Sequence, residues 1–249
     1  MKELARRRGR FGHIRILERK SDGARLYCID SSVQTMIQPD GVSMFGYVHA
    51  AKLLLGPAHR VLIVGGAGGS LATMLARAGH DVTVLDVDPA AEALARDYFG
   101  LDVRVRWFTG DLSSFYDAHH EVFDAVCVDA CDADGLVGGF DSPDTLIALM
   151  NLACPDGSLV LNLVHEDGAP PWGPLLAAEI AERGFNVTRY HAEQGWEGNE
   201  LLHIRARGPT DALRVADVQR RPPEARTYLL SLRAHSPRRR GDAPGGASS

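Results

Sequence analysis

Apolar and polar residues follow two different spacings along the chain. From Gly12 to Thr35 the sequence is strand-like: residues 13–18 and 25–30 flank the turn signal Ser21-Asp22-Gly23 and together predict a β-hairpin. Residues 45–55 have helical spacing, and Gly56-Pro57 ends that helix and marks a domain boundary. Residues 1–10 are basic and are expected to form a mobile arm.

Beyond this boundary, strand and helix patterns alternate. Near-continuous apolar segments such as residues 125–128 favour parallel strands covered on both faces. Strands are predicted at 61–65, 82–86, 103–108, 123–129, 158–163, 186–191 and 200–206, and helices at 69–78, 89–98, 143–153 and 173–183. The last two strands follow the final helix closely, and the pattern resembles the sheet of class I methyltransferases.

The fold class is therefore predicted to be α/β: a seven-stranded Rossmann-like sheet with a small N-terminal β-hairpin domain. We expect the domains to span residues 1–56, 57–208 and 209–249, the last being a C-terminal extension. Residues 236–249 are rich in Arg, Pro, Gly and Ser and are expected to be disordered.

Composition narrows the choice of partners. The 249 residues are 45% hydrophobic, which is enough for a large core, and the net charge of −5 argues against broad nucleic-acid binding. No apolar stretch approaches the ~18 to 20 residues of a membrane span, and the N-terminus does not resemble a signal peptide. The four cysteines lack zinc-ligand spacing, so we expect reduced thiols, no metal and a cytoplasmic location.

The glycine-rich turn Gly65-Gly66-Ala67-Gly68-Gly69 follows the apolar run at 61–64, and the next apolar run ends in Asp86. Glycines allow the backbone to approach a ligand closely, and an acid after the second strand can accept hydrogen bonds from ribose hydroxyls. The turn is not a complete dinucleotide fingerprint, because Leu71 stands where the third glycine is required. A tight strand-to-helix turn is the alternative interpretation.

Further carboxylates follow the third and fourth predicted strands. Asp111 could accept a hydrogen bond from an adenine amino group, or it could cap the next segment. Asp129 and Asp132 come directly after an apolar strand, at the sheet edge where ligands bind in open α/β folds. A carboxylate there could remove a proton from an amine nucleophile and attract a cationic substrate. A solvated acidic loop is the alternative.

Together these residues resemble the spermidine synthase (polyamine aminopropyltransferase) family. Ile29-Asp30-Ser31-Ser32-Val33-Gln34 is similar to its L-D-G-x-x-Q stretch and Phe45-Gly46-Tyr47-Val48-His49 to its tyrosine-bearing helix. Residues 61–69 resemble its V-L-x-x-G-G-G-D-G turn, and Val128-Asp129-Ala130-Cys131-Asp132 its D-[ST]-[ST]-D loop.

The resemblance implies roles for these positions. Asp129 would be the base that deprotonates the attacking amine, Asp132 would hold the amine, and Tyr47 would line the amine channel. Decarboxylated S-adenosylmethionine, or S-adenosylmethionine, would be the group donor. Its nucleoside would be bound by Gln34, Gly65, Gly66, Gly68, Asp86 and Asp111.

Departures from the family pattern keep other functions open. Gly68 replaces the family aspartate that meets the donor ammonium, and Ala133 replaces a proline. An S-adenosylmethionine-dependent methyltransferase is the runner-up, and a catalytically inactive nucleoside-binding homologue is a third possibility. The expected partners are a small-molecule amine and a second copy of the chain in a homodimer.

Overall fold

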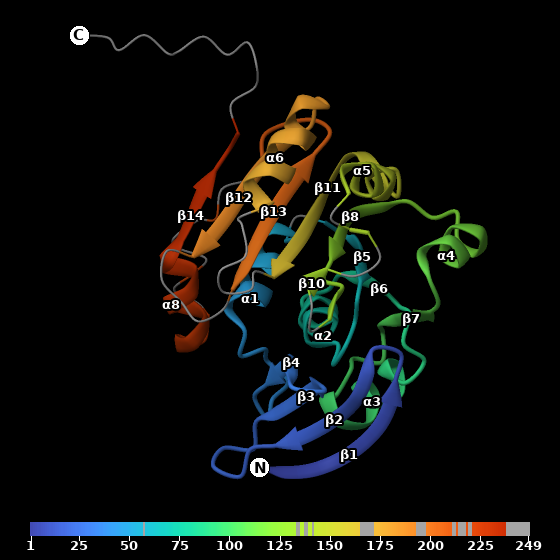
Figure 1. The fold of residues 1–249 in the computed structure, drawn as a ribbon, viewed down its shortest axis with the longest axis vertical. Helices are drawn as coiled ribbons and strands as arrows, with labels where there is room; N and C mark the ends of the chain where they lie inside the picture. Colours follow the sequence, from blue (N-terminus) through green and yellow to red (C-terminus); the bar gives the residue numbers. More distant parts are fainter. Residues whose placement is uncertain are drawn as a thin grey trace.

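The computed structural model describes residues 1–56, 58–132, 135–136, 139–140, 142–164, 172–192, 198–210, 213, 218 and 221–237. Two sheets, each packed against helices or apolar clusters, form the framework of the molecule. A four-stranded antiparallel sheet from the N-terminal part of the chain lies below the larger sheet in Figure 1, and helix α1 connects the two.

The N-terminal sheet has the order β1-β2-β3-β4, with β1 at Lys2–Gly9, β2 at Gly12–Glu18, β3 at Arg25–Ile29 and β4 at Ser32–Ile37. The predicted hairpin corresponds to β2 and β3. The prediction of a mobile arm at residues 1–10 was wrong, because β1 pairs with β2 from Lys2↔Glu18 to Gly9↔Gly12. Leu4 and Ala5 also pack against the apolar cluster beneath this sheet, which fixes the strand despite its exposed arginines.

The larger sheet has eight strands in the order β14-β12-β13-β11-β8-β5-β6-β7. Pairing is parallel from β11 through β8, β5 and β6 to β7, whereas β13 runs antiparallel to both β11 and β12. The strands are β5 (Arg60–Val64), β6 (Asp81–Asp86), β7 (Arg106–Thr109), β8 (Phe123–Val128), β11 (Ala153–Val164), β12 (Asn186–Ala192), β13 (Asn199–Arg205) and β14 (Leu232–His235). A separate two-residue pair joins β9 (Cys131–Asp132) to β10 (Gly135–Leu136).

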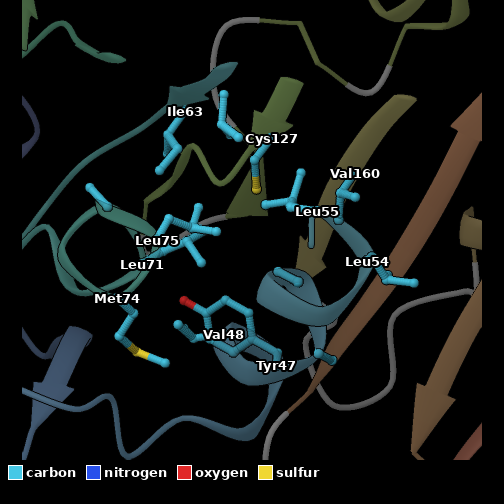
Figure 2. Packing of buried hydrophobic residues seen from close by; sticks show 14 of the residues in the cluster. Tyr47, Val48, Leu54, Leu55, Ile63, Leu71, Met74, Leu75, Cys127 and Val160 are labelled. Carbon is cyan, nitrogen blue, oxygen red and sulfur yellow. The ribbon is translucent and has the colours of Figure 1, made fainter. Parts of the chain in front are cut away.

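Helices cover both faces of this sheet, as the apolar strands require. Along β5, Val61 and Ile63 pack on one face, and Leu62 and Val64 pack on the other. Helices α1 (Gly46–Leu54), α2 (Ser70–Arg77), α3 (Ala91–Phe99) and α8 (Pro223–Ser231) lie on the first face, and α4 (Leu112–Ala118), α5 (Pro143–Met150) and α6 (Trp172–Glu182) lie on the second. In Figure 2 the ring of Tyr47 projects from α1 toward α2, in the same cluster as Leu71.

The α/β prediction is confirmed, and the seven predicted strands correspond to β5, β6, β7, β8, β11, β12 and β13. The pattern missed α4, α8 and β14, which adds an eighth strand at one edge of the sheet. Most of the predicted disordered tail, residues 238–249, lies outside the described residues. Within the described part of the chain, every helix is too short or too polar to span a bilayer.

Candidate active site

A cavity of about 760 Å³ lies between the N-terminal sheet and the carboxyl edge of the larger sheet. Its lining comes from β4 and the β1–β2 turn on one side, and from the ends of β5, β6, β8 and β11 on the other. This volume is within the range of small-molecule sites. Of the predicted site residues, Gln34, Tyr47, Gly65, Gly66, Asp86, Asp111 and Asp129 all line it.

The glycine turn is held in place by the predicted ribose-binding acid. Oδ2 of Asp86 accepts hydrogen bonds from the amides of Gly66 (2.7 Å) and Ala67 (3.2 Å), and Oδ1 accepts one from the amide of Asp88 (2.8 Å). Removal from water raises the pKa of Asp86, while these amides oppose the increase. Asp86 therefore connects the loops after β5 and β6 at the wall of the cavity.

Gly68 is not where we expected it. It is absent from the cavity lining, and its amide donates to Oγ1 of Thr35 on β4 at 3.1 Å. A Cβ at this position would lie 2.9 Å from Cγ2 of Thr35 and 3.0 Å from a ring carbon of Phe99. A side chain here would require Thr35 or Phe99 to shift, so the packing of β4 and α3 against the glycine turn disfavours an acid at this position.

Asp129 ends β8 and forms the centre of a hydrogen-bonded group inside the cavity. The hydroxyl of Tyr47 donates to its Oδ2 at 3.2 Å, and Nδ2 of Asn162 donates to its Oδ1 at 2.7 Å. Burial raises the pKa of Asp129, and these two donors only partly offset that effect. The result is a fixed, partly desolvated carboxylate with increased proton affinity, which suits a general base.

Two asparagines that support Asp129 were missed by the sequence analysis. Asn199 donates through Nδ2 to Oδ1 of Asn162 at 3.0 Å, and both residues line the cavity. The hydroxyl of Tyr228 on α8 donates to the carbonyl oxygen of Asn199 at 3.1 Å, so the C-terminal helix also supports the site. A signal was available for Asn162: it is the one polar residue among Leu159–Leu163 of a strand that pairs with β8.

Asp111 caps a helix that the sequence did not predict. Its Oδ1 accepts from the amide of Ser114 at 2.8 Å at the start of α4, which holds the pKa of Asp111 below its usual value. Asp111 therefore caps α4 and also lines the cavity, and its contact with adenine stays a prediction. The β1–β2 turn also lines the cavity, and a hydrogen bond from the amide of Arg10 to Oδ2 of Asp88 (2.7 Å) attaches this turn to the loop after β6.

The described lining residues contain four carboxylates and one basic side chain: Asp86, Asp88, Asp111 and Asp129 against Arg10. The cavity is therefore suited to a cationic ligand. Gln34 lies on the wall formed by β4, where its Nε2 donates to Oγ of Ser32 at 3.0 Å. The side chain of Asp132, predicted to hold the amine, lies outside the described residues.

Solved structures share this architecture. A probable spermidine synthase from Corynebacterium glutamicum superposes with a TM-score of 0.72 and 16% identity, covering 93% of this chain and 90% of that one. A spermidine synthase in complex with the transition-state analogue AdoDATO gives 0.65 and 19%, covering 87% and 76%. Human methyltransferase-like protein 13 in complex with SAH gives 0.52 and 20%, covering 74% and 87%. The chain has the fold of S-adenosylmethionine-dependent transferases and is structurally similar to spermidine synthases.

Two curated proteins are similar in sequence to this chain, and both are nodulation proteins. Nodulation protein S from Rhizobium tropici is 28% identical over 176 residues, which cover 66% of this chain and 71% of that protein. Nodulation protein S from Bradyrhizobium diazoefficiens is 29% identical over 165 residues, covering 63% and 76%. The solved NodS of Bradyrhizobium japonicum is named an N-methyltransferase, although its TM-score of 0.46 is too low for a structural argument. No family model matches the chain.

Proposed function

We propose that this chain is a transferase that alkylates an amine with an S-adenosyl sulfonium donor. The observation that carries the proposal is Asp129: a carboxylate with a raised pKa, oriented by Tyr47 and Asn162 inside a predominantly acidic cavity. Such a group can orient an amine and receive its proton. Asp86, which ends β6 and accepts hydrogen bonds from the glycine turn, would bind the ribose of the donor.

The reaction balances with the residues present. The nitrogen lone pair of the amine forms a bond to a carbon attached to the sulfonium, and the carbon–sulfur bond breaks. The bonding electrons return to sulfur, which leaves as a neutral thioether nucleoside, and Asp129 accepts the proton from nitrogen. Because the sulfonium is already a good leaving group, positioning and electrostatics would supply most of the rate.

Aminopropyl transfer from decarboxylated S-adenosylmethionine is the first candidate reaction. It is supported by the four-stranded N-terminal sheet that closes the cavity and by the likeness to spermidine synthases along most of the chain. The four lining carboxylates also suit a donor with two positive charges. The acceptor would be a small amine held beside Asp129 and Tyr47.

Methyl transfer from S-adenosylmethionine is the second candidate. Two observations favour it: the relatives by sequence are nodulation protein S, and the glycine turn has no carboxylate that could meet a donor ammonium at Gly68. The base, the nucleoside end of the cavity and the attack on carbon would be the same. The two candidates differ in which substituent of the sulfonium moves.

Analysis of the nucleoside product tests the proposal and separates the two candidates. The protein is incubated with each donor and a panel of primary amines. S-adenosylhomocysteine as the product indicates methyl transfer, and methylthioadenosine indicates aminopropyl transfer. Binding of these nucleosides without turnover of either donor would instead support the inactive homologue, and the absence of both binding and turnover would reject the proposed function.

The variant Tyr47→Phe is expected to move the acid limb of the pH–rate profile to higher pH. The Tyr47 hydroxyl stabilises the carboxylate form of Asp129, so its loss raises the pKa of Asp129 and lowers the ionised fraction at a given acidic pH. Rates of wild type and variant are compared across pH with one amine, whose own ionisation affects both equally. A lower plateau with an unmoved acid limb would show that Tyr47 does not act through Asp129.

A further inference from the structure

Helix α8 packs against α1, the helix that carries Tyr47 (Figure 1). Gly46 begins α1, and a Cβ at this position would overlap Cβ and Cγ of Tyr228 on α8. Because these atoms lie at the base of the Tyr228 side chain, they cannot move without α8. The ring of Tyr228 therefore lies against the backbone that immediately precedes Tyr47, and this close contact requires a glycine.

The hydroxyl at the far end of the same ring is bound to β13. It donates to the carbonyl oxygen of Asn199, the first residue of that strand, at 3.1 Å. From Asn199 the hydrogen bonds continue through its Nδ2 to Oδ1 of Asn162 (3.0 Å), and from Nδ2 of Asn162 to Oδ1 of Asp129 (2.7 Å). The hydroxyl of Tyr228 is thereby connected to the carboxylate through the two asparagines.

Tyr228 thus contacts both supports of the Asp129 carboxylate. Its ring holds the helix from which the Tyr47 hydroxyl donates to Oδ2 at 3.2 Å, and its hydroxyl holds the strand end that positions Asn162 at Oδ1. A donor at each oxygen fixes the rotation of a carboxylate, and hydrogen bonds to the charged form favour ionisation. Tyr228 is buried and lies outside the cavity lining, so its influence on the site passes through these neighbours.

We propose that Tyr228 is a positioning residue for the reaction at Asp129: it joins α1 to the start of β13 and so holds both donors of the carboxylate in place. The C-terminal part of the chain, through α8, then sets the orientation of the base. The catalytic part of this inference rests on the proposed function, whereas the coupling of Tyr228 to Asp129 can be measured in a protein without turnover.

The variant Tyr228→Phe removes the hydroxyl and keeps the ring in place. With the Asn199 carbonyl released, Asn162 should donate less well to Asp129. We expect kcat to fall about three- to tenfold, while KM for the donor stays within about twofold. A weaker donor stabilises the carboxylate less, so the acid limb of the pH–rate profile should also move to higher pH.

Tyr116→Phe is the matched control. It removes an equivalent hydrogen bond, from a tyrosine hydroxyl to the carbonyl oxygen of Ala148 at 2.8 Å, among helices that cover the other face of the sheet. Its kcat and pH–rate profile should equal those of wild type. In an Asn162→Ala background, Tyr228→Phe should change kcat by less than about twofold, because its route to the base is already interrupted.

A readout that needs no turnover completes the test. Carbon NMR of the side-chain carboxyls follows the titration of Asp129, whose signal is assigned by its absence in Asp129→Asn. We expect the midpoint to move to higher pH in Tyr228→Phe and Gly46→Ala, and to be unchanged in Tyr116→Phe. An unmoved midpoint in folded Tyr228→Phe, or an unchanged kcat in the active enzyme, would overturn the inference. If wild type alkylates no amine, the proposed function fails, and the midpoints alone decide the coupling.

Discussion

The Asp129→Asn variant is expected to lose about 10²- to 10⁴-fold of the amine-transfer rate while it retains its fold and its affinity for the nucleoside product. The amide fits the same space: its oxygen can accept from Nδ2 of Asn162, and its NH₂ group can donate to the Tyr47 hydroxyl. What it lacks is the ability to take a proton. Initial rates and a nucleoside titration on the same preparation measure both properties.

The stability of this variant provides an internal control, and its sign follows from the pKa. Because burial raises the pKa of Asp129, the folded protein binds that proton more tightly than the unfolded chain does. The ionised carboxylate therefore costs stability once the pH exceeds the folded-state pKa, and the cost disappears below the unfolded-state value. We expect Asp129→Asn to be at least as stable as wild type near neutral pH, with a smaller difference in acid.

Asp124, at the opposite end of β8, offers a matched comparison. It accepts hydrogen bonds from the amides of His59 (2.9 Å) and Arg60 (2.8 Å), and these amides lower its pKa. Asp124→Asn should therefore lose stability at neutral pH and keep activity in the fraction that remains folded.

The result that would contradict the role of Asp129 is near-wild-type turnover in Asp129→Asn, which would show that Asp129 is not the base.

Gly65→Ala is expected to cause the largest loss of stability, about 2 to 6 kcal/mol, together with loss of activity. Gly65 has a φ of 91°, and a Cβ there would overlap the backbone carbonyl of Asp129. The carboxyl ends of β5 and β8 meet at this point. A methyl group must therefore push the two strand ends apart and move the Asp129 side chain away from Tyr47. Chemical denaturation and initial rates measure the two effects.

Gly79→Ala is the control for this prediction. Gly79 has a similar φ of 98°, but nothing lies within 4 Å of the Cβ it would carry. The free energy of unfolding of Gly79→Ala should fall only by the cost of backbone strain, ~1 to 2 kcal/mol, and the variant should retain activity. Equal losses in the two variants would mean that strain alone governs Gly65 and that the close approach of β8 is unimportant.

Much of the core fold was predictable because parallel strands buried on both faces have a clear pattern. Apolar segments such as Val61–Val64 contrast with the helices that follow them, and the predicted ranges agree with β5 and α2 to within about two residues. The terminal segments were harder to predict. β1 is rich in exposed arginine, and its few apolar side chains become informative only when the cluster beneath the sheet is known.

The site was only partly predictable, because topology determines the positions of some of its residues, whereas strand register and packing determine the positions of others. Acids that end strands, such as Asp86 and Asp129, must meet at the carboxyl edge, so topology alone indicates their proximity. Asn199 lies far from Asp129 in sequence, on an antiparallel strand. Its role depends on the register of β13 with β11, in which Asn199 is opposite Val164. Similarly, the position of Gly68 depends on β4 packing against the glycine turn, which local sequence does not encode.

A crystal structure with S-adenosylhomocysteine would most directly test whether an adenosyl donor lies at the carboxyl edge of the sheet with its sulfur facing Asp129. We predict that the ribose hydroxyls contact Asp86, the sulfur lies within reach of an amine bound at Asp129 and Tyr47, and the nucleoside fills the cavity between the two sheets. A nucleoside bound outside this cavity, or one whose sulfur is directed away from Asp129, would contradict the proposal.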